Sequence, residues 1–183
     1  AEDSLLAPSA LVKNHGHFAG HALFEEGVIT IQDESSQLVA PTLDLQGDEK
    51  VLDACSAPGG KTMHIASYLT TGQVTALDLY DHKLTLIEEN AQRLGLADRV
   101  ITKKLDARRV FETFGVDAFD KILVDAPCSG IGLIRRKPDI KYNKKNADFI
   151  SLQKIQLEIL DSVCQSLRKG GIITYSSCTI VSQ

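Results

Sequence analysis

Four cysteines are the residues of this chain best suited to covalent chemistry, and they stand at positions 55, 128, 164 and 178. Their wide spacing is unlike a disulfide framework, and without a C-x-x-C pair a structural zinc site is not expected. Such thiols are either packing residues or nucleophiles. Cys164 falls in an apolar helical pattern, so we expect it to be a packing residue. Cys128 follows a proline in a turn and Cys178 follows two serines, which makes both candidates for catalysis.

The second chemical feature is a glycine loop, Ser56-Ala-Pro-Gly-Gly-Lys-Thr62. Its end is similar to a phosphate-binding loop, but that pattern requires glycine at Cys55, and Pro58 has no N–H to offer a phosphate. The other interpretation is a strand-to-helix turn that lets a small ligand approach the backbone. Asp78 lies about 20 residues after the loop, where an acidic residue would bind ribose hydroxyls. We therefore expect a nucleotide-like ligand.

The elements that must position these residues alternate between strands and helices. Strands are predicted over 50–55, 73–78, 99–105, 120–125 and 172–178. One helix is predicted over 61–69 and a second from an N-cap at Asp81 to Gly95. A third is predicted over 148–167, ended by Gly170-Gly171. This alternation predicts an α/β fold, a doubly wound parallel sheet whose ligands bind beyond the carboxyl ends of its strands. The residues expected at those ends are the glycine loop, Asp78, Asp106, Asp125 with Cys128, and Cys178.

The composition is that of a globular domain, with 183 residues, 43% hydrophobic and 24% charged, and a net charge of −4. Disorder, collagen and membrane spans are not expected, and we predict a soluble, cytoplasmic protein. Residues 1–49 differ in character from the rest, with a strand predicted at 28–31 and a helix at 33–40. We assign 1–49 to an N-terminal segment and 50–183 to the main domain. The main domain is expected to be truncated after its fifth strand.

Three motifs in order carry a resemblance to a known family: Asp53-Ala-Cys-Ser-Ala-Pro-Gly-Gly-Lys-Thr62, Asp125-Ala-Pro-Cys-Ser-Gly130 and Tyr175-Ser-Ser-Cys-Thr179. Together they resemble the Sun (Fmu) family of RNA cytosine-5 methyltransferases, and residues 27–40 resemble the stretch before its catalytic domain. The resemblance implies an S-adenosylmethionine-dependent methyltransferase fold with sheet order 3-2-1-4-5, its catalytic domain at 50–183. It implies methyl transfer from S-adenosyl-L-methionine to carbon 5 of a cytosine in RNA, specifically 16S ribosomal RNA, leaving S-adenosyl-L-homocysteine.

The same resemblance assigns roles to individual residues. Cys178 corresponds to the nucleophile, Cys128 to the cysteine that assists product release, and Asp125 to the acid facing both cofactor and base. The residues implied for the methionine side of the cofactor are Cys55, Ser56, Ala57, Pro58, Gly59, Gly60 and Lys61. Asp78 matches the ribose-binding acid and Asp106 the residue near adenine. One departure from the family is Ser56, where alanine is common.

The chemistry explains why a cysteine is required. Carbon 5 of cytosine is a poor nucleophile until a thiolate adds to carbon 6, and a base must later remove the carbon-5 proton. In the related enzymes that act on DNA, the cysteine after proline would be the nucleophile, so Cys128 and Cys178 remain alternatives on residue type alone. The Ser-Ser-Cys-Thr motif favours Cys178. Lys61 is a candidate source of positive charge near the site.

A basic stretch lies between the two candidate thiols. Its six cationic residues, against the single acid Asp139, are Arg135, Arg136, Lys137, Lys141, Lys144 and Lys145. We interpret them as contacts to the RNA backbone, with a solvated loop as the alternative. His15, His17 and His21 are close in sequence, but no carboxylate or cysteine pattern accompanies them and we expect no metal. Two other functions stay open: a nucleotide hydrolase using Lys61, and a non-catalytic RNA-binding module. A monomer is favoured.

Overall fold

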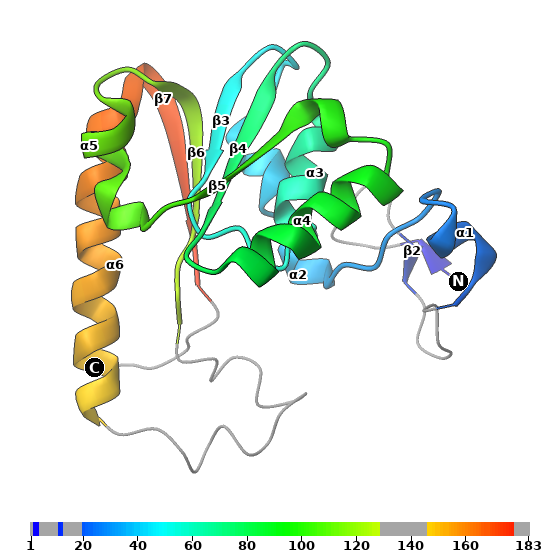
Figure 1. The fold of residues 1–183 in the computed structure, drawn as a ribbon, viewed down its shortest axis with the longest axis horizontal. Helices are drawn as coiled ribbons and strands as arrows, with labels where there is room; N and C mark the ends of the chain where they lie inside the picture. Colours follow the sequence, from blue (N-terminus) through cyan, green and yellow to red (C-terminus); the bar gives the residue numbers. More distant parts are fainter. Residues whose placement is uncertain (1, 4–10, 13–19, 129–145, 178–183) are drawn as a thin grey trace.

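A five-stranded parallel sheet lies between two layers of helices in the computed structural model, which describes residues 2–3, 11–12, 20–128 and 146–177 (Figure 1). The strands are β3 (Lys50–Asp53), β4 (Gln73–Asp78), β5 (Val100–Lys104), β6 (Phe119–Asp125) and β7 (Leu167–Ser176). Their order is β5-β4-β3-β6-β7. Numbered along the chain within this sheet, that is 3-2-1-4-5, so the predicted fold class is confirmed.

Helices connect the strands as right-handed crossovers require. They are α1 (Ala22–Glu25), α2 (Glu34–Gln37), α3 (Gly60–Tyr68), α4 (Asp81–Arg93), α5 (Val110–Phe114) and α6 (Asn146–Ser166), with 3₁₀ turns η1 (Ala40–Leu43), η2 (Ala97–Arg99) and η3 (Ala107–Arg109). Near the N-terminus, β1 (Glu2–Asp3) pairs antiparallel with β2 (Leu11–Val12). Within the described ranges no helix has the length and apolarity needed to cross a membrane.

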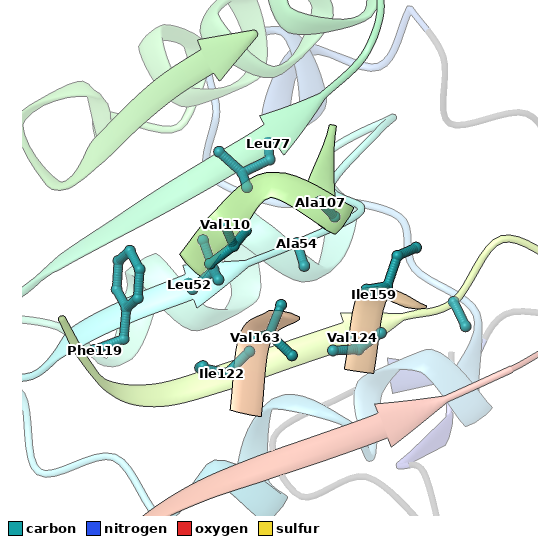
Figure 2. Close-up of a cluster of buried hydrophobic side chains, with 11 residues drawn as sticks. Leu52, Ala54, Leu77, Ala107, Val110, Phe119, Ile122, Val124, Ile159 and Val163 are labelled. Carbon is teal, nitrogen blue, oxygen red and sulfur yellow. The ribbon is translucent and has the colours of Figure 1, made fainter. Parts of the chain in front are cut away.

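Alternation along the strands divides the core between the two faces of the sheet. Leu52 and Ile122 point to the face covered by α5 and α6, where they join the cluster drawn in Figure 2 with Val110 and Val163. Neighbouring residues such as Val51 point to the opposite face, covered by α3 and η1. Both faces are thus buried, as expected of a doubly wound sheet.

The glycine pair at 170–171 does not end a helix as predicted. The last helix stops at Ser166, and the pair lies inside β7, where the register against β6 shifts between Phe119 and Lys121. Gly170 has φ +82°, and a Cβ on Gly171 would lie 2.5 Å from the carbonyl oxygen of Asp120. The pair therefore permits a β-bulge, which needs one residue at positive φ and one close backbone approach.

Asp81 is the first residue of α4 rather than its N-cap, which is Tyr80. The Asp81 carboxylate instead pairs with Lys104 Nζ on β5 at 2.5 Å. Gly95, where this helix is predicted to end, has φ +67°, the left-handed conformation that is typical of the residue after a helix. Helix ends depend on contacts with neighbouring strands that local patterns do not contain.

The segment before the sheet docks on α4. The strand predicted at 28–31 does not form, because these residues have an irregular conformation. Arg93 holds it: Nη1 donates to the carbonyl oxygens of Phe24 at 2.6 Å and Ile29 at 3.3 Å. The guanidinium also lies 4.0 Å from the centre of the Phe24 ring. The helix predicted over 33–40 is shorter, with α2 followed by η1.

A substitution at Gly27 tests this docking, because Gly27 has φ +74° and a Cβ there would lie 1.7 Å from the carbonyl oxygen of Arg93. Gly27→Ala must push the segment off α4, and we expect amide hydrogen exchange at 23–29 to accelerate at least about tenfold. Gly95→Ala is the matched control, since it has a similar φ but no atom within 4 Å. Gly95→Ala should lower the free energy of unfolding only by the strain of the left-handed conformation, about 1–2 kcal/mol. Equal exchange in the two variants would contradict the close packing.

Candidate functional site

Acidic residues from different strands meet at the carboxyl edge of the sheet. Asp53, Asp78 and Asp125 are the last residues of β3, β4 and β6. Asp106 follows β5 and caps η3, accepting a hydrogen bond from the Arg108 N–H at 3.0 Å. Because the strands are parallel, all four carboxylates lie at one edge, where ligands of such sheets bind.

The glycine loop turns the chain from β3 into α3. Ser56 Oγ donates to the carbonyl oxygen of Asp53 at 2.7 Å, and the Gly59 N–H donates to the carbonyl oxygen of Ser56 at 2.7 Å. Gly59 has φ +102°, and a Cβ there would lie 3.2 Å from Ile87 Cγ1. At Gly60 a Cβ would meet only Gln32 Nε2, at 3.9 Å. The loop therefore packs closely against Ile87 of α4 at Gly59, and it leaves space towards the segment that contains Gln32 at Gly60.

Asp53 is the most buried carboxylate of the edge, 1% exposed. Its Oδ2 accepts a hydrogen bond from Thr62 Oγ1 at 2.7 Å, while Oδ1 has no partner among the described residues. Burial, reinforced by the charge of Asp125, raises the pKa of Asp53 to about 6 against the Thr62 hydrogen bond. A phosphate loop would use the Thr62 hydroxyl on magnesium, and here it is already committed to Asp53.

Asp125 is held from two sides. Lys61 Nζ lies 2.6 Å from Oδ2, and Ser176 Oγ donates to Oδ1 at 2.6 Å. The Lys61 side chain is 19% exposed, so this ion pair is only partly screened by water. The positive charge predicted near the site is therefore present, and it is aimed at Asp125.

Cys55 lies among these acids as a neutral thiol. Burial raises its pKa to about 12, and the charges of Asp53, Asp125, Asp78 and Asp106 act in the same direction. A thiolate is the nucleophilic form of cysteine, so Cys55 is unsuited to nucleophilic attack. Its environment fits a packing residue in the cavity wall.

Asp78 and Asp106 differ in how freely they can meet a ligand. Asp78 accepts from the Tyr80 N–H at 3.1 Å, and its nearest cation is Lys83 Nζ at 3.7 Å. Asp106 is bound by the guanidinium of Arg108, with Nη2 at 2.6 Å and Nε at 3.1 Å. Hydrogen bonds from Arg108 hold the pKa of Asp106 below its ordinary value.

A cavity of about 200 Å³ opens beside the glycine loop. Its walls come from the loop, the strand ends and the N-terminal segment, namely Ile31, Gln32, Asp33, Ser36, Asp53, Cys55, Ser56, Ala57, Pro58, Gly60, Lys61 and Asp125. Asp106 and Arg108 instead line a separate, larger cleft of about 470 Å³ against α6. The structure thus brings most predicted cofactor residues together with Asp125 and leaves Asp106 on a neighbouring surface.

Several cavity residues were missed by the sequence analysis. Gln32 and Ser36 lie in the stretch 27–40, for which the family resemblance assigns no role to individual residues. Ser176, which ends β7 and is not part of the cavity wall, was missed as the partner of Asp125. Asp53 carries the one signal that could have been used, because it is an acidic residue directly after two apolar strand residues. An acid at a fully buried strand position is uncommon without a functional or structural reason.

Two groups of predicted site residues, Cys178 and the basic stretch from Arg135 to Lys145, lie outside the described residues. Cys128 lies inside them, on a loop that α6 holds through Gln156 Nε2, which donates to the carbonyl oxygen of Pro127 at 2.8 Å. Of the three histidines, His21 is described and its Nδ1 accepts from the Leu23 N–H at 3.3 Å. No group of three metal-ligating side chains occurs in the described ranges.

A sheet in the order 3-2-1-4-5, with a glycine loop after its first strand and acids after the next strands, defines the class of S-adenosylmethionine-dependent methyltransferases. The chain belongs to the 16S rRNA methyltransferase RsmB/F family, whose model matches residues 40–183. This membership confirms the family resemblance that the three motifs indicate.

Individual relatives agree with the family. The chain is 52% identical over 176 residues to the probable ribosomal RNA small subunit methyltransferase B of Bacillus subtilis, covering 96% of this chain and 39% of that protein. It is 42% identical over 165 residues to ribosomal RNA small subunit methyltransferase B of Citrobacter koseri, covering 89% and 38%. The crystal structure of NSun6 from Pyrococcus horikoshii with SFG superposes with a TM-score of 0.83 at 32% identity, covering 91% and 42%. The chain spans less than half the length of these proteins.

The residues present fit S-adenosylmethionine, the cofactor of this family. The ligand combines ribose, adenine and a zwitterionic amino acid, and the edge offers carboxylates for the hydroxyls and cationic groups. The backbone at Gly60 is open towards space that the protein does not fill, and Asp53, a buried residue of the cavity wall, keeps an Oδ1 without a partner among the described residues. Asp106 would meet the cofactor only with its Arg108 contacts rearranged or shared.

The raised pKa of Asp53 predicts a pH-dependent stability. The folded protein keeps the proton up to about pH 6, whereas the unfolded chain releases it near 3.8, so the stabilisation is complete below about pH 4 and is lost as pH rises through 6. Asp53→Asn keeps an acceptor for Thr62 without the charge. Relative to this variant, the unsubstituted protein should lose up to about 3 kcal/mol of unfolding free energy between about pH 4 and pH 7. Urea unfolding at each pH measures this difference, and a constant value would contradict the assignment.

Proposed function

We propose that residues 50–183 are the catalytic domain of an enzyme that methylates carbon 5 of a cytosine in 16S ribosomal RNA, using S-adenosylmethionine. Residues 1–49 lead into this domain. The observation that carries the proposal is the cavity at the carboxyl edge, where the glycine loop, Lys61 and Asp125 face one space. Family membership over residues 40–183 supplies the substrate class. An activity on ribosomal RNA belongs in the cytoplasm.

The cofactor would lie along the strand ends. Residues Cys55 to Lys61 would contact its methionine side, Asp78 its ribose hydroxyls and Asp106 the region of its adenine. Hydrogen bonds that the ribose hydroxyls donate to a charged acceptor such as Asp78 are worth about 1.5–3 kcal/mol each. When bound, the cofactor supplies an electrophilic methyl group on sulfur. The chain's contribution is to orient that group above the place where the base enters.

Asp125 would accept a hydrogen bond from the exocyclic amine of the target cytosine and would bind ring N3 through a proton carried by either the carboxyl group or the ring. Its position suits this role because Lys61 and Ser176 hold both carboxylate oxygens, so the group cannot swing away from the cavity. The Lys61 ammonium also offsets the repulsion among neighbouring carboxylates. A base positioned in this way presents carbon 6 to a thiolate and carbon 5 to the methyl donor.

We assign the attacking thiolate to Cys178 and the second cysteine, which assists product release, to Cys128. Attack on carbon 6 forms a covalent cysteine–cytosine adduct and makes carbon 5 nucleophilic. After methyl transfer, loss of the carbon-5 proton lets the thiolate leave. The neutral state of Cys55 supports this assignment, since it removes the cysteine closest to the glycine loop from the list of nucleophiles.

RNA containing 5-fluorocytosine tests the assignment because fluorine at carbon 5 cannot leave as a proton, and the covalent adduct persists. In the whole protein, Cys178→Ala should abolish the slowly migrating adduct on a denaturing gel, whereas Cys128→Ala should retain it. Cys164 lies on the exposed face of α6, so the expectation that it is a packing residue was wrong. Cys164→Ala is the matched control and should behave like the unsubstituted protein. Adduct kept by Cys178→Ala and lost in Cys128→Ala would exchange the two roles.

The stretch from Arg135 to Lys145 is proposed to contact the RNA backbone. Six cations follow the Asp125 motif closely in sequence, so they adjoin the catalytic residues along the chain. Backbone contacts of this kind release counterions and make affinity dependent on salt.

Lys144→Ala with Lys145→Ala should therefore flatten the plot of log affinity against log salt, by about 1.4–1.8 in slope for two lost contacts. Filter binding of ribosomal RNA fragments across a salt series measures it. The control pair, Lys154→Ala with Lys169→Ala, removes the same charge from α6 and β7 and should leave the slope unchanged. A slope unaffected by the first pair would refute the role of the stretch.

A further inference from the structure

A side-chain hydrogen bond joins the last residues of β6 and β7, two strands that lie side by side in the sheet (Figure 1). Asp125 and Ser176 are paired in register, and Ser176 Oγ donates to Asp125 Oδ1 at 2.6 Å. The main chain fastens the same pair, because the Ala126 N–H donates to the carbonyl oxygen of Ser176 at 2.8 Å. Ser176 is not part of the cavity wall, so it acts on that space through Asp125.

Asp125 has a second partner on its other oxygen, because Lys61 Nζ lies 2.6 Å from Oδ2. The two partners differ in stiffness. Lys61 carries its ammonium on a flexible four-carbon stem, whereas the Ser176 hydroxyl is attached directly to a Cβ on the backbone of β7. Ser176 therefore restricts the rotation of the carboxylate more tightly than Lys61 does. The Asp125 side chain is 33% exposed and lines the cavity, so a base that enters there can reach it.

Both partners donate, so both oxygens of Asp125 act as acceptors. A carboxylate has about four lone-pair positions, and the ammonium and the hydroxyl occupy one each. The bond from Ser176 has the length of a charge-assisted O–H···O⁻ bond, about 2.5–2.7 Å, a kind about twice as strong as a neutral one. A proton on Oδ1 would weaken this bond, because a protonated oxygen is a poorer acceptor. A proton on Oδ2 would face an ammonium, which has no lone pair to accept it.

This direction of the hydrogen bonds distinguishes cytosine from uracil. The two bases differ at carbon 4, where cytosine has an amine that donates hydrogen bonds and uracil has an oxygen that accepts them. A carboxylate whose two oxygens both accept can bind the amine, and it repels the carbonyl oxygen. To bind uracil in the same place, Asp125 would need to carry a proton and turn it towards the base. The hydrogen bond from Ser176 opposes both changes.

We propose that Ser176 is a specificity-determining residue, which makes the site select cytosine over uracil by holding both oxygens of Asp125 as hydrogen-bond acceptors. It is a positioning residue, since it acts through Asp125. The inference rests on the proposed function for the role of Asp125, and it places the proton of the N3 contact on the ring. It also gives the motif Tyr175-Ser-Ser-Cys-Thr179 a second task besides supplying a thiol.

Transfer of a tritium-labelled methyl group to two RNAs tests the proposal. One is a ribosomal RNA fragment that the whole protein methylates, and the other has uridine in place of the modified cytidine. Ser176→Ala should lower the ratio of kcat/KM for cytosine over that for uracil about tenfold or more, as expected for one lost hydrogen bond to a charged group. Ser176→Thr keeps a hydroxyl at this position and should preserve the ratio.

Thr174→Val is the matched control. It removes another hydroxyl of β7, one that shares a hydrogen bond of 2.7 Å with Thr42 Oγ1 and none with Asp125, and it should leave the ratio unchanged. Calorimetry with S-adenosylhomocysteine should give affinities within about twofold for all variants. Thermal unfolding verifies that each variant is folded. If Ser176→Ala does not fold, Ser176→Val compared with Ser176→Thr makes the same test, because the two side chains have the same shape and differ in the hydroxyl.

Three results would overturn the role of Ser176 while the proposed function stands. They are equal use of the two RNAs by the unsubstituted protein, an equal loss on both RNAs in Ser176→Ala, and a ratio that Ser176→Thr changes as much as Ser176→Ala does. A ratio unchanged in Ser176→Ala has the same meaning as an equal loss. If the unsubstituted protein methylates neither RNA, the proposed function fails and this inference with it.

Discussion

Mutual repulsion of carboxylates at one edge of the sheet is the constraint on which the site depends. Parallel strands deliver Asp53, Asp78, Asp106 and Asp125 to the same edge, and each acid is accommodated differently. Asp125 has an ion pair with Lys61, Asp106 a guanidinium, and Asp78 a more distant ammonium. Asp53 has a hydroxyl and a raised pKa in place of a cation. A ligand that brings positive charge to this edge is therefore attracted by the site as a whole.

The positions of the strands and of their terminal acids were predictable from sequence because both depend on local patterns. The strand at Gln73–Asp78 agrees residue for residue, and Asp125 ends β6 as expected. The bulge at Gly170 and Gly171 was missed, since a glycine pair after a helical pattern looks the same whether it ends a helix or lies inside a strand. Only the close approach of Asp120 distinguishes the two.

The candidate site was predictable in part. Apart from Gly59, the motif residues from Cys55 to Lys61 share a cavity with Asp125. The place of Gln32 in the cavity wall was not predictable from the resemblance of residues 27–40, because it depends on an irregular segment that Arg93 anchors from more than sixty positions along the chain. The Lys61–Asp125 pair likewise joins two motifs whose spacing in sequence carries no information on distance. Contacts between residues that are far apart in the sequence are the part of a site that local sequence patterns cannot predict.

The neutral thiol of Cys55 has a chemical consequence for an enzyme that handles a methyl donor. Sulfur anions are strong competitors for electrophilic methyl groups, and a thiolate beside the glycine loop would consume the reagent and block the pocket with a thioether. Burial and the surrounding acids keep this sulfur protonated far above neutral pH. With the proposed cofactor bound, the protein would thus hold a soft, adaptable atom next to an alkylating agent without methylating itself.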